Sequence, residues 1–443
     1  MQPVDTWKNK LNSLTPDIRQ LLSGSSSSFL IRTLAVVISL FIQIVLARQL
    51  GATSFGEYTL VITCALLFAQ FSCFGFDTSS VRFISAYKSS SQLDLLGGII
   101  RTSFVIPFSI SITLSILIVS FTCSDIFIIQ DIRVETIIAG ALVIPILTLS
   151  TIRQSALRAL KHVTLSLLPD NIFRPLILIS ISTYLYLSSP NSVTSSQAMV
   201  AYIASAMFAF ILGIIFLAKK LPKTTSVSYQ NRYWINTSIP LLLAASMTIL
   251  MSKADIIMIG FLISPKDSGI YAIASQLSEF VPFGLFALNI ILAPMISDFH
   301  TKNLHDKIQS VVSLTTKLAS GFAVSIAAIF FFFGEIILKQ FGLEFTAAYY
   351  SFCILLVGQI FNVFSGPVVV ILSMVSQEKV AAKIIFIATA LNILLNFILI
   401  PAIGLEGAAI ATATSLIFWN VLMAIYIWKK LNINSTLFSY AQK

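Results

Sequence analysis

Residues 28–48 read SFLIRTLAVVISLFIQIVLAR, an apolar run with Arg32 near its start and Arg48 at its end. A helix that rises 1.5 Å per residue needs about 20 apolar residues to cross a hydrocarbon layer of about 30 Å. Runs of comparable length follow at 56–76, 98–120, 134–152, 172–188, 197–218, 235–263, 269–297, 308–334, 346–374, 382–402 and 405–428. The sequence therefore predicts an all-α polytopic membrane protein with about twelve transmembrane helices.

The composition supports this prediction. Hydrophobic residues make up 57% of the chain, charged residues only 10%, and the mean hydropathy is +0.92, which excludes a soluble core. In residues 1–27, Trp7, Leu11 and Leu14 recur at helical spacing among basic residues, which predicts an amphipathic helix on the cytoplasmic membrane surface. This leader is too long, and the first run too extended, for a cleaved signal peptide.

The segments between the apolar runs, here called gaps, differ in their content of lysine and arginine, and gaps rich in these residues alternate with gaps that have few. All but six of the 28 fall in one set of gaps, which includes both termini. The exceptions are four residues in the other gaps and two inside the runs: Arg48, Arg133, Lys266, Lys339, Arg32 and Lys253. Because cytoplasmic loops are enriched in Lys and Arg, both termini are predicted to be cytoplasmic. The net charge of +10 then reflects topology and anionic lipid headgroups, and it requires no nucleic acid.

Patterns for catalysis or metal binding are not found in the sequence. The four cysteines lie in or beside apolar runs, and His300 and His305 have no acid–cysteine cluster nearby, so packing and solvated loops are the favoured interpretations. The P-loop, the nucleophile-elbow and the zinc-protease patterns do not occur. We therefore expect no metal, no cofactor, no enzymatic activity and no ATP hydrolysis by this chain.

The chain resembles a tandem repeat with an offset of 213 residues. Gly56 and Tyr58 follow the first run, and Gly269 and Tyr271 follow the seventh, in each case where a short outer loop enters the next helix. Six crossings per half would give both halves the same orientation. The predicted organisation is an N-terminal segment, a six-helix bundle, a linker, a second six-helix bundle and a cytoplasmic tail, at 1–27, 28–218, 219–234, 235–430 and 431–443.

Short motifs occur in a fixed order from about residue 25 to residue 430. They are Leu50-Gly51-x4-Gly56-x-Tyr58, Gly75-Phe76-Asp77 through Val81-Arg82-Phe83-Ile84, Asp255-x4-Gly260, Gly269-Ile270-Tyr271, Ala293-Pro294-Met295-Ile296-Ser297, Asn362-x3-Gly366-Pro367 and Ile400-Pro401-Ala402-Ile403-Gly404-Leu405-Glu406-Gly407-Ala408. In order and spacing they resemble a polysaccharide-export flippase of the Wzx type, within the multidrug/oligosaccharidyl-lipid/polysaccharide exporter superfamily.

This resemblance implies a V-shaped pair of six-helix bundles in the bacterial inner membrane. It implies that alternating access moves a polyprenyl-diphosphate-linked oligosaccharide, such as an O-antigen or capsule repeat unit, from the cytoplasmic to the periplasmic leaflet, with ion or proton coupling. Membrane lipids, a polysaccharide polymerase and a chain-length regulator are the partners it suggests in lipopolysaccharide or capsule synthesis.

A diphosphate inside the membrane needs cationic partners. Arg32 and Lys253 are the basic residues embedded in runs, one in the first helix of each half, and we predict that they bind substrate. Arg would suit bidentate phosphate binding, and Lys would act as a point charge. Alternatively, Arg32 extends to the headgroups, or Lys253 forms a structural ion pair with Glu279.

The buried acids of the runs are predicted to be Asp255 and Glu279, with ion coupling as their role. Asp255 and Lys253 are two residues apart and should point to different sides of their helix. Asp77 and Arg82 are candidates for a cytoplasmic gate-side ion pair, and Arg174 is a candidate for the cytoplasmic mouth, with solvated or headgroup contacts as the alternative for all three.

Two other functions compete. A cation-coupled multidrug antiporter of the same superfamily would have an acid-lined cavity, and the embedded charges do not decide between them. A membrane glycosyltransferase or polymerase would need a large outer loop, which the short outer gaps do not provide.

Overall fold

The computed structural model describes residues 16–124, 132–188, 193–222, 226–302 and 304–438, with side chains from Ile31 onward except that of Arg32. Within these residues the regular structure is entirely helical. The first half contains α2 (Pro16–Ser72), α3 (Phe76–Ser89), α4 (Leu93–Cys123), α5 (Val134–Ala159), α6 (Val163–Leu168), the π-helical turn η1 (Pro169–Phe173), α7 (Arg174–Ser188) and α8 (Ser195–Ala218). The second contains α9 (Asn231–Leu262), α10 (Pro265–Ser278), α11 (Phe283–Thr301), α12 (His305–Lys339), the 3-10 turn η2 (Leu343–Ala348), α13 (Tyr349–Phe364), α14 (Val368–Met374) and α15 (Glu378–Leu431).

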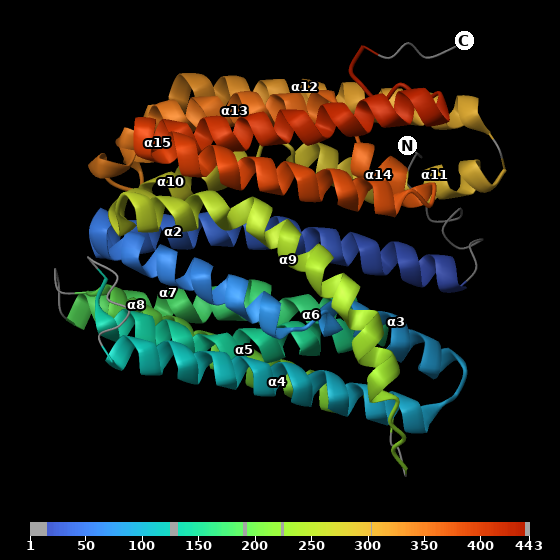
Figure 1. The fold of residues 1–443 in the computed structure, drawn as a ribbon, viewed down its shortest axis with the longest axis horizontal. Helices are drawn as coiled ribbons and strands as arrows, with labels where there is room; N and C mark the ends of the chain where they lie inside the picture. The colour runs from blue at the N-terminus through green and yellow to red at the C-terminus, as the bar shows by residue number, and fades with distance from the viewer. Residues whose placement is uncertain (1–15, 125–131, 189–192, 223–225, 303, 439–443) are drawn as a thin grey trace, which may run out of the picture.

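Two of the long helices are hairpins. Helix α2 breaks at Gly51, whose φ of 70° and ψ of 169° suit only glycine, and α15 breaks at Ile403 and Gly404. Figure 1 shows each of them folding back on itself. Ten segments of the described chain are long and apolar enough to span a membrane. Because two of these are hairpins, they supply twelve crossings, and the predicted polytopic all-α fold is confirmed.

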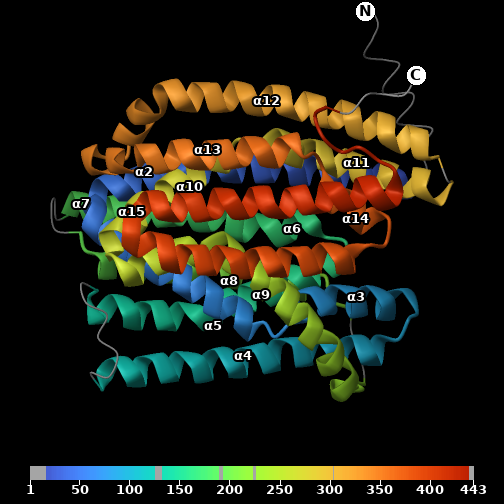
Figure 2. The same cartoon turned by 45° about the horizontal axis from the view of Figure 1, so that its top comes forward.

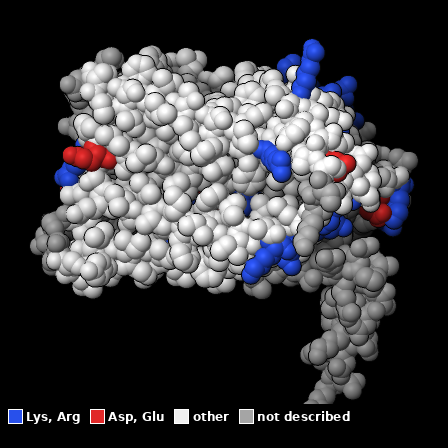
Figure 3. Space-filling view, turned by 90° about the horizontal axis from the view of Figure 1, so that it is seen from below, with Lys and Arg blue, Asp and Glu red and all other residues white. Residues whose placement is uncertain are grey.

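The crossings run between two ends of the molecule (Figures 1 and 2). The basic end carries the turns with Lys88, Lys302 and Lys379; the opposite end carries those with Lys266 and Lys339. In Figure 3, charged side chains gather toward the two ends and leave a broad uncharged band between them. This distribution suits a body embedded in lipid.

The two six-helix bundles have separate cores at the basic end and a joint core at the opposite end. One core, with Phe83 and Leu157, belongs to the first bundle, and another, with Val312 and Met423, belongs to the second. A third cluster contains residues of both halves, including Phe55 and a ring from η2, Phe345. The bundles are therefore joined at one end and diverge toward the other, as in a V.

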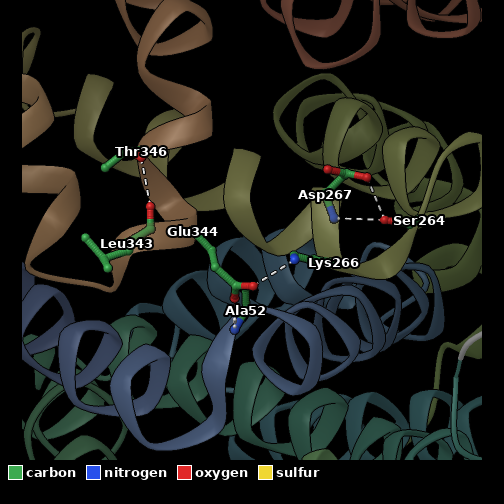
Figure 4. Close-up of polar contacts among 7 residues, drawn as sticks. All are labelled: Ala52, Ser264, Lys266, Asp267, Leu343, Glu344 and Thr346. Carbon is green, nitrogen blue, oxygen red and sulfur yellow. Dashed lines mark hydrogen bonds and ion pairs between the residues drawn. The ribbon is translucent and has the colours of Figure 1, made fainter.

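Close contacts seal the opposite end. Phe55 and Phe345 pack edge to face with their ring centroids 5.6 Å apart. Glu344 accepts hydrogen bonds from Lys266 Nζ at 2.8 Å and from the backbone N–H of Ala52 at 3.3 Å, so one carboxylate ties the α2 hairpin to two elements of the second half (Figure 4). Arg48 adds a bond from its Nε to the carbonyl oxygen of Gln340, at 2.6 Å.

Helix α9 connects the two bundles. Its first half packs on the first bundle: Trp234 is fully buried there and donates from Nε1 to the Tyr87 hydroxyl at 3.0 Å, and Ser238 lies 2.7 Å from Ser79 between hydroxyl oxygens. Its second half packs against α15 and α10 of the second bundle. Helix α9 begins at Asn231, inside the predicted linker 219–234. Of the predicted surface segment 1–27, residues 1–15 lie outside the described residues, and the backbone of 16–27 is part of α2.

Candidate transport site

Two neighbouring polar cavities lie within the second bundle, and both are bordered by Glu279 and Trp419. The larger, of 310 Å³, is bounded by α11, α13, α14 and α15. The smaller, of 210 Å³, is bounded by α9, α10, α13 and α15. Polar side chains of membrane-spanning helices must face protein or water rather than lipid. These cavities are therefore suited to a polar solute or an ion.

Asp255 is the buried acid of the smaller cavity. Its side chain accepts from the backbone N–H of Ile256 at 2.8 Å and from the Thr412 hydroxyl at 3.3 Å. Asn392 donates to the same hydroxyl at 3.3 Å, and Asn396 donates to Asn392 at 3.0 Å. Among the described residues, no basic nitrogen lies within 4.0 Å of the Asp255 carboxylate. A buried carboxylate without a cationic partner is costly when ionised, so this site can take up a proton or a small cation.

Glu279 differs from its prediction as a buried acid. Helix α10 ends at Ser278, and the chain turns before α11 begins at Phe283, so the Glu279 side chain is exposed. The prediction failed because an apolar run was taken as one continuous buried helix. Glu279 nevertheless borders the same 210 Å³ cavity as Asp255, so the structure brings the two predicted coupling acids to one site.

Lys253 lies outside the face of α9 that lines this cavity. That face carries Thr248, Ser252 and Asp255, whereas Lys253 is partly exposed elsewhere on the helix, as its two-residue spacing from Asp255 predicts. The alternative ion pair between Lys253 and Glu279 is not formed in the described structure. The backbone of Arg32 belongs to the first arm of α2, and its side chain lies outside the described residues.

Asp77 and Arg82 do not form the predicted gate-side ion pair. Asp77 accepts a hydrogen bond from Gln70 Nε2 at 3.0 Å, and Arg82 is exposed. Positions five apart in an α-helix are separated by about 140° around its axis, which directs the two side chains to different faces of α3.

Arg174 lies inside the first bundle rather than at its mouth. Residues 163–171 lie in the gap between the predicted runs 134–152 and 172–188, but they form α6 and most of η1 and lengthen this crossing. The Arg174 guanidinium sits 4.0 Å from Asp170 and 5.4 Å from the centre of the Tyr202 ring. Asp170 also pairs with Arg153, a fully buried residue of α5 that was predicted to be cytoplasmic.

Several site residues carry no sequence motif. Asn289, Gln359, Asn392 and Asn396 are polar residues of apolar runs, and their position is the only signal that marks them, whereas Asn362 also belongs to the motif Asn362-x3-Gly366-Pro367. The sequence interpretation overlooked Asp170, Thr412, Trp419 and Asn420, which acquire their importance from helices that are distant in sequence. In the part of the chain described, no three His, Cys, Asp or Glu side chains form a metal-binding group.

Comparison with known proteins gives matches along the chain. The family model described as polysaccharide biosynthesis protein matches residues 21–300, and the MatE model matches residues 240–398. A probable low-salt glycan biosynthesis flippase of Haloferax volcanii, Agl15, is 31% identical over 194 residues, which cover 43% of this chain but only 40% of that protein. An uncharacterized membrane protein of Methanocaldococcus jannaschii, MJ1068, is 22% identical over 92% of this chain and 83% of its own length.

Solved structures share the fold. An inward-facing multidrug resistance MATE family transporter of the MOP superfamily has a TM-score of 0.72 at 12% identity and covers 90% of this chain and 94% of its own. The lipid II flippase MurJ, in an inward closed conformation, has a TM-score of 0.70 at 18% identity, with coverage of 92% and 87%. The resemblance found in the motifs is thus confirmed: this chain belongs to the polysaccharide biosynthesis protein family and has the fold of MATE and MurJ transporters.

Proposed function

We propose that this protein is a flippase that moves a polyprenyl-diphosphate-linked oligosaccharide between leaflets by alternating access. The observation that carries this proposal is a pair of polar cavities inside one of two bundles that share a core at the end opposite the basic end and have separate cores at the basic end. With the basic end cytoplasmic, as the positive-inside rule requires, substrate would enter from the cytoplasm of a bacterial inner membrane. Family membership and the glycan flippase relative support a glycan as cargo.

The substrate diphosphate would bind to Lys253 and Arg32. Both lie on the first helix of their half, and Lys253 is a partly exposed lysine within the membrane-spanning region. A cation retained there without a described ion-pair partner is costly unless an anion arrives. A diphosphate supplies that anion. The sugars would then lie in polar surroundings, while the polyprenyl tail would stay in lipid.

Asp255 would couple transport to a proton or cation gradient. Its hydrogen-bond chain through Thr412 and Asn392 joins α9 to α15, so occupancy of the carboxylate would change how firmly α9 is held to the second bundle. The first half of α9 packs on the other bundle, so a movement of one bundle relative to the other would strain this chain of hydrogen bonds.

A cation-coupled antiporter is the second candidate. The charged residues that border the two cavities are Asp255 and Glu279, which would attract a cationic solute, and the MatE match covers this part of the chain. A lysine on the same helix as Asp255 favours the flippase. A polymerase or chain-length regulator would act downstream as a partner.

Deleting the gene tests the choice. The proposal expects lipid-linked glycans to accumulate on the cytoplasmic leaflet, and expects reconstituted protein to move the extracted lipid across vesicles without ATP. Normal leaflet distribution of these lipids in the deletion strain, together with sensitivity to cationic drugs, would establish the antiporter instead.

A further inference from the structure

Three residues that border the 310 Å³ cavity carry buried polar atoms that lack a hydrogen-bond partner among the described residues. They are Asn289 Oδ1, Asn420 Oδ1 and Trp419 Nε1. Asn420 is fully buried, and its Nδ2 donates to Asn362 Oδ1 at 3.0 Å and to the Leu416 carbonyl at 2.9 Å. Its donors are thereby occupied, while its acceptor oxygen is buried and has no partner among the described residues.

Unpaired groups of this kind are costly within a membrane-spanning bundle. Three of them belong to residues of α11 and α15 that border one cavity, where rotation of the side chains would let them pair with a ligand that has its own donors and acceptors. A single water molecule would occupy only a small part of 310 Å³, which is at the lower end of ligand pockets.

The lining chemistry identifies the ligand class. Among the described side chains, no lysine or arginine borders the cavity, so it lacks the cationic partner that a buried phosphate needs. Amide groups and the indole N–H pair well with hydroxyl groups, and the flat face of an indole suits the apolar face of a sugar ring. Glu279, the one charged residue among the described side chains that border the cavity, can accept from hydroxyls and repels anions.

We infer that the cavity bordered by Asn289, Trp419 and Asn420 is a carbohydrate subsite that binds one uncharged sugar of the lipid-linked glycan, apart from the diphosphate. The inference rests on the proposed function and adds where the sugar is recognised. The sugar and the diphosphate are then bound by different groups of the protein. Amide and indole groups bind the sugar in this cavity, and the cationic groups of Lys253 and Arg32 bind the diphosphate.

Two lipids can be used to test the carbohydrate subsite and the diphosphate site separately. One is the lipid-linked glycan extracted from cells that lack the gene, and the other is bare polyprenyl diphosphate. Trp419→Phe removes the indole donor but keeps an aromatic ring, and Asn289→Leu removes the amide. Each should weaken binding of the glycan lipid to purified full-length protein by about 3- to 10-fold, the effect of one hydrogen bond, and change binding of the bare lipid less than twofold.

Trp428→Phe is the matched control, because Trp428 lies on the same helix, α15, and is 62% exposed. It should change the binding of neither lipid. A second readout leaves the site intact: with Trp7 and Trp428 replaced by Phe, the glycan lipid should alter tryptophan fluorescence, and the bare lipid should not. This readout also covers the case in which Asn289→Leu does not fold.

The possible outcomes are distinct. Equal binding of the two lipids by the wild-type protein, or equal weakening of both by Trp419→Phe, would overturn the carbohydrate subsite and leave the flippase standing. Failure of the wild-type protein to bind either lipid would overturn the proposed function and this inference together.

Discussion

Gly56 and Gly269 hold equivalent positions in the predicted tandem repeat, and their backbones pack directly against each other. A Cβ built on Gly269 would lie 2.5 Å from the Cα of Gly56, and one built on Gly56 would overlap the carbonyl of Pro265. A duplicated position that contacts its own copy lies on the axis that relates the two halves. The closed contact between the two bundles at the opposite end, called the seam below, is therefore centred on the predicted pseudo-symmetry axis and leaves no room for a side chain at Gly56 or Gly269.

A side chain at this seam should force it open. We expect Gly56→Val to favour a conformation open at the opposite end, and to raise labelling of Ala52→Cys by a membrane-impermeant thiol reagent in a background without native cysteines. Gly321→Ala in α12 is the control, because a Cβ there meets no atom within 4 Å, and it should leave labelling unchanged. Unaltered labelling in folded Gly56→Val protein would show that the seam does not depend on this contact.

The buried pair Arg153–Asp170 should dominate the stability of the first bundle. Asp170→Asn leaves the Arg153 charge uncompensated and should lower stability by about 3–5 kcal/mol, seen as a lower melting temperature in detergent. Asp298→Asn breaks an exposed ion pair with Lys302 and should cost at most about 1 kcal/mol.

A double variant provides the check for that pair. Arg153→Met with Asp170→Leu removes both charges and should recover most of the lost stability. If Asp170→Asn alone melts like the wild-type protein, the pair is not important for stability.

Asp255 should be required for coupling rather than for substrate movement. In vesicles, Asp255→Asn should abolish accumulation driven by a proton or cation gradient while allowing slow equilibration of substrate between leaflets. Thr412→Val removes one hydrogen-bond donor and should weaken coupling less. Asp267→Asn, whose carboxylate bonds to Ser264 at the opposite end, is the matched control. Gradient-driven accumulation by Asp255→Asn would assign coupling elsewhere.

Lys253 should contribute a charge-assisted contact to the diphosphate. Lys253→Ala should weaken substrate binding by about 10- to 100-fold, equivalent to about 1.5–3 kcal/mol, and Lys253→Arg should retain more affinity. Arg32→Lys should lose more than Lys253→Arg, because a bidentate fork is lost. Binding and membrane abundance are measured together.

Glu279→Gln separates this role from a structural one. If Lys253 served mainly to pair with Glu279, then Lys253→Ala would reduce abundance and Glu279→Gln would restore it. Normal binding by an abundant Arg32→Ala, Lys253→Ala double variant would remove both residues from the substrate site.

The two ends should face opposite sides of the membrane. In a background without native cysteines, Lys302→Cys should be protected from an impermeant reagent in intact spheroplasts, and Leu343→Cys, with a side chain 78% exposed, should be labelled. Labelling of both, or of Lys302→Cys alone, would contradict the orientation derived from the lysines and arginines.

Sequence reasoning succeeded where the physics is local. Each crossing is defined by its own apolar length, and the hairpin breaks at Gly51 and Gly404 fall between runs that were read as separate helices. It failed where charges compensate one another across helices. Arg153 and Asp170 made the segments around them look like a loop, although α5 continues to Ala159 and the next helix begins at Val163.

The site shows the same division. Asp255 is recognisable as an acid inside an apolar run, but the hydroxyl that bonds to it, and the amide that bonds to that hydroxyl, come from α15, more than 130 residues away. In the sequence, Trp419 resembles any aromatic residue of a membrane helix. Only the structure shows that it borders one cavity with Glu279 and Asn289. No spacing rule links residues that meet only when α10, α11 and α15 pack together.

The placement of Trp234 has a consequence for biogenesis. Its indole fills a buried position in the first bundle, next to Tyr87, yet it is synthesised only after the last helix of that bundle, α8, is complete. The first six crossings therefore leave the ribosome with a vacancy in their core. They complete their packing only when the start of the second half reaches the membrane, so the two repeats mature together as one protein rather than as two consecutive ones.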